Sequence, residues 1–133
     1  MRISISTAFA LAAIVCALPI AASAEPSYIC SIGEVYECEG VTGCKRVSTD
    51  AINLSEFILV DTDNKQLTSA SIGEAPRTED IEGLSKTDKN IFLYGTQGTD
   101  AWNATVSLEN GALTGGISSG SSSFALFGNC MKK

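Results

Sequence analysis

The cysteines are the residues whose type and number most directly suggest chemistry. The chain has five: Cys16 lies in an apolar N-terminal stretch, and Cys30, Cys38, Cys44 and Cys130 follow it. An even number of cysteines in an exported protein is typical of disulfides. A zinc site is not expected, because no pair has the spacing of about two to four residues found in structural sites, and the chain has no histidine.

Three pairings of these four cysteines are possible, and chain geometry favours one. Cys38 and Cys44 enclose a short loop with two glycines, whose ends can approach within the roughly 7 Å that a disulfide tolerates. Cys30 then pairs with Cys130 and joins the first strand to the last. The main alternative, Cys30 with Cys38, needs a tight hairpin at Gly33, because the two Cα atoms would lie about 26 Å apart on one extended strand.

Nucleophilic catalysis has little support in the sequence. The absence of histidine excludes serine and cysteine triads as well as zinc proteases of the HExxH type. A lysine can replace histidine in a Ser-x-x-Lys arrangement, but no serine in the chain has a lysine three residues later. The sequence therefore predicts neither catalytic nor cofactor-binding residues, and no enzymatic activity.

Closely spaced carboxylates are the remaining candidates for chemistry. They occur at Glu37/Glu39, at Asp61/Asp63 and in the segment 79–82 (Glu79, Asp80, Glu82). Such pairs can hydrolyse glycosides, but alternating acids on a strand usually form its solvated face. The segment 61–65 resembles the start of a calcium loop, yet Gln66 occupies the position of the invariant glycine, so a polar turn is expected there instead. No metal ion or cofactor is predicted.

The N-terminus has the pattern of an export signal. Arg2 precedes a nearly continuous apolar run from Ala8 to Ile20, and the small residues Ala22-Ser23-Ala24 provide a cleavage site. The run is too short for a permanent membrane span. Val15 directly before Cys16 fits a lipoprotein signal poorly. We therefore expect a cleaved signal peptide at residues 1–24, one domain at residues 25–133, and a bacterial product in the periplasm or outside the cell.

The rest of the chain predicts an all-β domain. Apolar and polar residues alternate from Trp102 to Leu108, and Asn110-Gly111 follows as a strong hairpin signal. Other strands are expected at Ser27 to Cys38, Glu56 to Asp61, Gln66 to Ile72, Thr78 to Leu84, Asn90 to Tyr94, Ala112 to Ser118 and Ser123 to Cys130. The first of these is expected to bend at Gly33, and the serine-rich segment 118–123 is interpreted as a hairpin loop. A single helical turn is expected within Asp50 to Ser55. About seven or eight short strands in sequential hairpins indicate a small antiparallel meander barrel or sandwich, stapled by two disulfides.

The aromatic residues are interpreted as core. Trp102 shares its strand face with Ala104, Val106 and Leu108, and Tyr28 is expected to cover an end of the barrel. With Trp102, Phe124 and Leu126 inside so small a barrel, the interior is expected to be packed shut.

The chain resembles two groups of proteins. Tyr28-x-Cys30, the Trp102 strand and Phe127-x-x-Cys130 resemble small exported bacterial proteins of uncharacterised function. The predicted end-to-end disulfide is similar to that of periplasmic inhibitors of C-type lysozyme, which are small barrels that insert a serine and a lysine into the lysozyme cleft. Ser85-Lys86 and Lys89 are the nearest counterparts, although they do not reproduce that motif.

These observations predict an exported binding protein whose partner is a protein of the envelope or the extracellular space. Two alternatives are an inhibitor of a basic enzyme such as lysozyme, which a formal charge of −6 would suit, and a carrier of a small apolar ligand. The same charge argues against a nucleic-acid partner, because phosphate binding requires clustered Lys and Arg.

Overall fold

A computed structural model describes residues 27–70 and 73–133 of the chain. The predicted signal peptide lies outside these residues. The elements are β1 (Ser27–Glu39), β2 (Gly43–Val47), the 3₁₀ turn η1 (Asp50–Ile52), β3 (Phe57–Asp61), β4 (Gln66–Ala70), β5 (Arg77–Asp80), β6 (Gly83–Lys86), β7 (Asn90–Gln97), β8 (Asp100–Ser107), β9 (Ala112–Ser119) and β10 (Ser122–Lys132).

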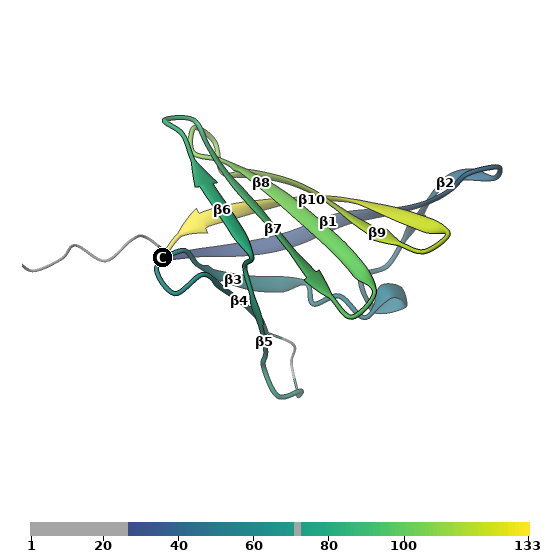
Figure 1. Ribbon diagram of the computed structural model, residues 1–133, viewed down its shortest axis with the longest axis horizontal. Coiled ribbons are helices and arrows are strands. Elements are labelled where there is room, and N and C mark those ends of the chain that lie inside the picture. The colour runs from purple at the N-terminus through teal and green to yellow at the C-terminus, as the bar shows by residue number, and fades with distance from the viewer. Residues whose placement is uncertain (1–26, 71–72) are drawn as a thin grey trace, which may run out of the picture.

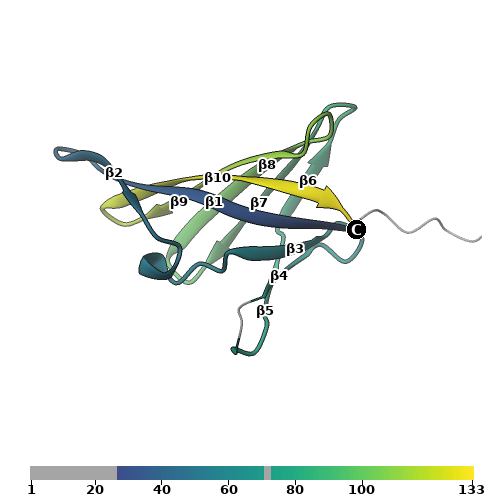
Figure 2. The same cartoon turned by 180° about the vertical axis from the view of Figure 1, so that it is seen from behind.

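The strands form one antiparallel sheet that curls into a half-barrel (Figure 1). Its order is β5-β4-β3-β1-β10-β9-β8-β7-β6, and β2 pairs separately with β1. The view from behind shows the first and last strands side by side in the middle of the sheet (Figure 2). The all-β prediction is confirmed, and residues 27–70 and 73–133 form ten strands instead of the expected seven or eight.

The long strand β1 organises one half of the molecule. Its first part pairs with β3 and its second part with β2, while β10 runs along its whole length. A bulge between Ile32 and Glu34 bends the strand at Gly33, where the sequence predicts a bend. Because of the bulge, both Ile32 and Val35 face the interior and are buried. The strand β2 was not among the predicted strands.

The hairpin β8–β9 forms as its sequence predicts. Gly111 has a φ of 75°, which the turn after Ser107 requires and which costs glycine little. Trp102, Ala104 and Val106 all face the interior of the half-barrel. The serine-rich segment is also a hairpin loop as predicted, although β9 and β10 pair up to Ser119 and Ser122 and leave only Gly120 and Ser121 between them.

The prediction of one strand over Thr78 to Leu84 was wrong. The chain leaves β5 at Asp80 and enters β6 at Gly83, and these two strands are the opposite edges of the sheet. Between them, the N–H of Ile81 donates to the carbonyl of Lys65 (2.8 Å), and the N–H of Glu82 donates to the carbonyl of Tyr94 (3.0 Å). Ile81 and Glu82 therefore connect the two edge strands of the half-barrel. The strands β5 and β6 do not pair with each other.

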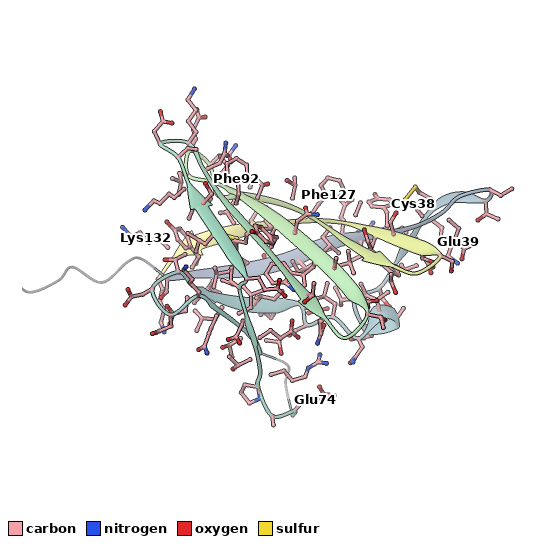
Figure 3. All side chains as sticks on the ribbon, viewed as in Figure 1. Cys38, Glu39, Glu74, Phe92, Phe127 and Lys132 are labelled. Carbon is pink, nitrogen blue, oxygen red and sulfur yellow. A yellow bond between two sulfur atoms is a disulfide. The ribbon has the colours of Figure 1, made fainter. Side chains whose placement is uncertain are left out.

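The core lies along the inner face of this curled sheet. Its buried apolar side chains are Tyr28, Ile32, Val35, Val60, Ile81, Ile91, Leu93, Val106, Leu113 and Leu126. The outer surface carries charged and apolar side chains, among them the exposed Glu39, Phe92 and Phe127 (Figure 3). The end of β7 extends to Gln97, beyond the predicted Tyr94, so the turn to β8 contains Gly98 and Thr99.

Candidate functional site: an apolar cavity in the half-barrel

Both predicted disulfides are present in the structure. Cys30 of β1 lies directly opposite Cys130 of β10, with the Cα atoms 3.9 Å apart. Cys38 and Cys44 join β1 to β2, with the Cα atoms 4.0 Å apart. The alternative Cys30–Cys38 pairing is excluded, because β1 continues through Gly33 without a hairpin. Two disulfides indicate that the domain folds in an oxidising compartment.

Most of the carboxylate candidates lie on the outer surface or in turns, whereas Glu79 lines the cavity described below. Glu37 forms an ion pair with Lys45 (3.1 Å), and Glu39 accepts a hydrogen bond from the hydroxyl of Thr42 (3.0 Å). Glu82 accepts hydrogen bonds from the N–H and the hydroxyl of Thr96. These contacts give Glu37, Glu39 and Glu82 local structural roles.

Asp61 organises the turn between β3 and β4. One of its oxygens accepts the backbone N–H groups of Asp63 (3.1 Å) and Asn64 (2.9 Å), and the other accepts the side-chain amide of Asn64 (2.8 Å). The backbone and then the side-chain hydrogen bonds from Asn64 hold the pKa of Asp61 below its ordinary value. The segment 61–65, which resembles the start of a calcium loop, is therefore a polar turn that is held by hydrogen bonds to the carboxylate of Asp61.

The serine and lysines of the lysozyme-inhibitor resemblance lie together at one end of the molecule. Ser85 and Lys86 end β6, and Lys89 lies in the turn that leads to β7. All three residues are exposed. The tip of the β6–β7 hairpin, where these residues lie, projects from the half-barrel (Figure 1).

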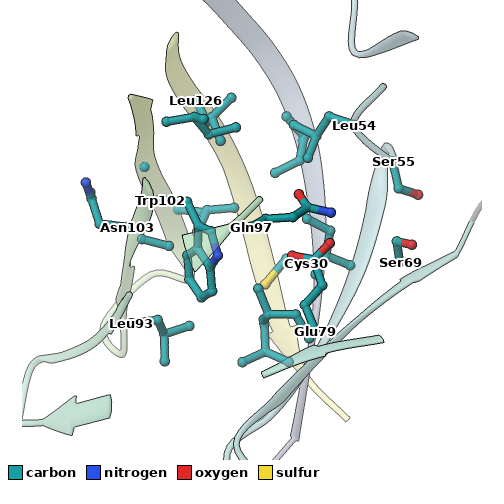
Figure 4. A pocket seen from close by; sticks show the side chains of 18 of the residues that line it. Cys30, Leu54, Ser55, Ser69, Glu79, Leu93, Gln97, Trp102, Asn103 and Leu126 are labelled. Carbon is teal, nitrogen blue, oxygen red and sulfur yellow. The ribbon is translucent and has the colours of Figure 1, made fainter. Parts of the chain in front are cut away.

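The interior of the half-barrel contains a cavity of about 130 Å³. The expectation of an interior packed shut was therefore wrong. The apolar side chains that line the cavity come from most of the sheet and from the loop after η1: Cys30, Ile32, Leu54, Ile58, Val60, Leu67, Leu93, Trp102, Ala104, Leu113, Ile117 and Leu126. Figure 4 shows several of them pointing to a common space.

Small residues at inward positions leave this space open. Ala104 of β8 pairs with Leu93 of β7 on one side and with Gly115 of β9 on the other. Both Ala104 and Gly115 line the cavity, so two neighbouring positions of the inner face carry little or no side chain. The large residues on the facing strands do not fill the volume that these two positions leave.

Trp102 forms one wall of the cavity. Its cross-strand partner on β7 is Gly95, and the indole ring packs over this glycine. A Cβ atom on Gly95 would lie 2.6 Å from Cζ2 and 3.1 Å from Nε1 of Trp102. The absence of a side chain at Gly95 therefore leaves the space that the ring occupies, as an aromatic residue commonly covers a glycine across two antiparallel strands.

The indole nitrogen of Trp102 is a buried hydrogen-bond donor. Within the described residues, no acceptor lies within hydrogen-bonding distance of Nε1. Figure 4 shows the nitrogen on the side of the ring that faces Gln97 and Glu79. Buried indole N–H groups usually have a partner, since an unsatisfied polar group costs free energy.

Polar residues surround one side of the cavity. Gln97 and Asp100 flank the β7–β8 turn, and Arg77 and Glu79 come from the edge strand β5. Arg77 donates a hydrogen bond from Nη2 to the carbonyl of Asn53 (3.0 Å), which connects β5 to the loop after η1. Gln97, Arg77 and Asn53 are exposed, so this polar side is where the cavity approaches solvent.

Alternation along the Trp102 strand predicts that this side chain faces inward, but it does not reveal the cavity. The available signal was the combination of Gly95, Ala104 and Gly115 at inward positions beside a tryptophan. Recognising it requires the register between β7, β8 and β9, which alternation within one strand does not provide. Glu79 was considered only as one of several closely spaced carboxylates, and Arg77, which precedes the expected strand Thr78 to Leu84, was not a candidate.

Within residues 27–70 and 73–133, no three His, Cys, Asp or Glu side chains are arranged to hold a metal ion. Nor does this part of the chain contain a helix with the length and apolarity needed to span a membrane. Comparison of the chain with protein families, curated proteins and solved structures found no match.

Proposed function

We propose that the protein is an exported, non-enzymatic binding protein that holds a small, largely apolar ligand in the half-barrel cavity. The observation that carries this proposal is the cavity of about 130 Å³ with predominantly apolar walls. Its size is close to that of an engineered cavity of about 150 Å³ that binds benzene. Ligand sites are typically concave and apolar, with a few polar groups that orient the ligand.

The disulfides and the N-terminal sequence support export. Two disulfides suit an oxidising compartment, and residues 1–24 have the charge, apolar run and cleavage triplet of a signal peptide. N-terminal sequencing of the protein released from periplasm or culture fluid should begin at Glu25. A product that retains Met1 would contradict this part of the proposal.

Binding can be tested with ethylbenzene, an apolar molecule with a single ring. Trp102 is the only tryptophan in the chain and lines the cavity, so its fluorescence should change saturably as ethylbenzene is added. The variant Ala104→Leu adds volume inside the cavity and should abolish this response. Ala101→Leu, at an exposed position of the same strand, is the matched control and should leave it unchanged.

Failure of ethylbenzene to bind the wild-type protein would contradict the proposed cavity function. Equal loss of binding in both leucine variants would also contradict it, since the exposed Ala101 does not line the cavity. Turnover of generic ester, peptide or glycoside substrates by the purified protein would contradict the non-enzymatic part of the proposal.

Inhibition of a basic enzyme such as lysozyme is a second candidate. The observation that favours it is the projecting β6–β7 tip with exposed Ser85, Lys86 and Lys89 on an acidic protein. The protein should then slow lysozyme in a turbidity assay, and added salt should weaken the effect. The double variant Lys86→Ala/Lys89→Ala should lose inhibition without changing the ethylbenzene response.

A further inference from the structure

We infer that the cavity selects an uncharged molecule of about one ring that carries a hydrogen-bond acceptor, such as a carbonyl oxygen, which accepts the N–H of Trp102. This inference rests on the proposed ligand-binding function and specifies the chemistry of the ligand. Three features of the cavity carry it: its size, the unpaired indole N–H, and the charges at its polar side.

The size of the cavity limits the body of the ligand. Drug-sized ligands occupy pockets of roughly 300–1,000 Å³, whereas this cavity has about 130 Å³. Leu54, Leu126 and Ile117 make apolar contact surfaces for the ligand. A single aromatic or aliphatic ring with a short substituent matches this volume, and a long acyl chain does not.

The unpaired donor specifies the polar atom of the ligand. Nε1 of Trp102 is buried and has no acceptor within the described part of the chain. The ring has no room to move toward β7, because a Cβ on Gly95 would already lie 2.6 Å from Cζ2 and 3.1 Å from Nε1 of Trp102. An acceptor on the ligand would satisfy this N–H, and the gain is large because a buried unsatisfied donor is unfavourable.

The charges beside the cavity determine the charge of the ligand. Its ionisable lining residues are Arg77, Glu79 and Asp100, two acids and one base. Arg77 already donates one hydrogen bond to the carbonyl of Asn53. An anionic ligand would therefore meet a net negative charge, while a neutral carbonyl compound would not be repelled.

Three probes of similar size distinguish the possibilities: acetophenone has a neutral carbonyl acceptor, ethylbenzene has no acceptor, and benzoate is an anion. We expect acetophenone to bind about fivefold more tightly than ethylbenzene, and benzoate to bind most weakly. Affinities can be measured from amide chemical shifts. The single indole N–H resonance of Trp102 should move downfield with acetophenone and not with ethylbenzene.

The variant Trp102→Phe provides the second test. It keeps a ring over Gly95 and removes the donor, so the advantage of acetophenone over ethylbenzene should disappear while both still bind. Equal affinity for the two probes in the wild-type protein would overturn the inference, and so would tightest binding of benzoate, which would indicate capture by Arg77. In both of these outcomes ethylbenzene still binds, whereas failure of the proposed function itself is the absence of ethylbenzene binding.

Discussion

Individual residues explain why this small barrel is not filled. Gly95 lets the indole of Trp102 lie flat against β7, and Ala104 and Gly115 leave neighbouring inward positions almost empty. The burial of Trp102 could be predicted from the alternation along its strand. The cavity could not, because its volume depends on which residues of three strands lie side by side.

The contact between Gly95 and Trp102 can be tested by adding one methyl group. In Gly95→Ala the new Cβ would lie 2.6 Å from Cζ2 of Trp102, so the ring must move. We expect the free energy of unfolding to fall by about 1–3 kcal/mol, measured by urea denaturation. Gly116→Ala is the control, because its nearest neighbours would lie at 3.5 Å. An equal loss in both variants would contradict this account of the pair.

The carboxylate of Asp61 should make stability depend on pH. Hydrogen bonds from Asn64 lower the pKa of Asp61 in the folded state, so its stabilising contribution is present above the ordinary pKa of about 3.9. That contribution is lost as the pH falls through the lowered folded-state pKa. The difference in Tm between the wild type and Asp61→Asn should therefore shrink between pH 5 and pH 2. A difference that is constant over this range would contradict the prediction.

Among the strands, the break between β5 and β6 is the feature that the local sequence does not predict. Local alternation from Thr78 to Leu84 resembles one strand, but the partners of its two halves differ. Gln66 of β4 pairs with Asp80, and Tyr94 of β7 pairs with Gly83. The break depends on these long-range partners. In contrast, the Asn110-Gly111 hairpin and the bend at Gly33 depend on local backbone preferences and were predicted.

Glu82 extends the β6–β7 pairing with its side chain. Its carboxylate accepts the N–H of Thr96, two residues beyond the last β7 residue that pairs with β6. We expect Glu82→Ala to raise the hydrogen-exchange rate of the Thr96 amide about tenfold. Glu109→Ala, an exposed glutamate in the β8–β9 turn, serves as the control. Unchanged exchange at Thr96 in Glu82→Ala would show that the carboxylate does not protect this edge.

At the scale of the whole molecule, the two disulfides constrain very different lengths of chain. Cys30–Cys130 spans 100 residues and holds the first and last strands together in the middle of the sheet. Cys38–Cys44 spans six residues at the tip of one hairpin. Both pairings could be predicted, because five intervening residues allow a close approach of Cys38 and Cys44 and leave the other two cysteines to pair.

The long-range disulfide should contribute more to stability. In the chain-entropy model a loop of about 100 residues is worth about 4.7 kcal/mol, and the short loop roughly 2 kcal/mol. The double variant Cys30→Ala/Cys130→Ala should therefore lose more free energy of unfolding than Cys38→Ala/Cys44→Ala, measured in urea. A larger loss in the second variant would contradict the proposed role of Cys30–Cys130 as the main covalent constraint.

The proposed site for a small, largely apolar molecule lies inside the half-barrel. Crystals of the protein soaked with bromobenzene provide the most direct test, because the anomalous signal of bromine locates the bound molecule. We predict one site inside the half-barrel, in contact with Trp102, Leu54 and Leu126. Bromine peaks only on the outer surface, or no peak in fully soaked crystals, would contradict the claim.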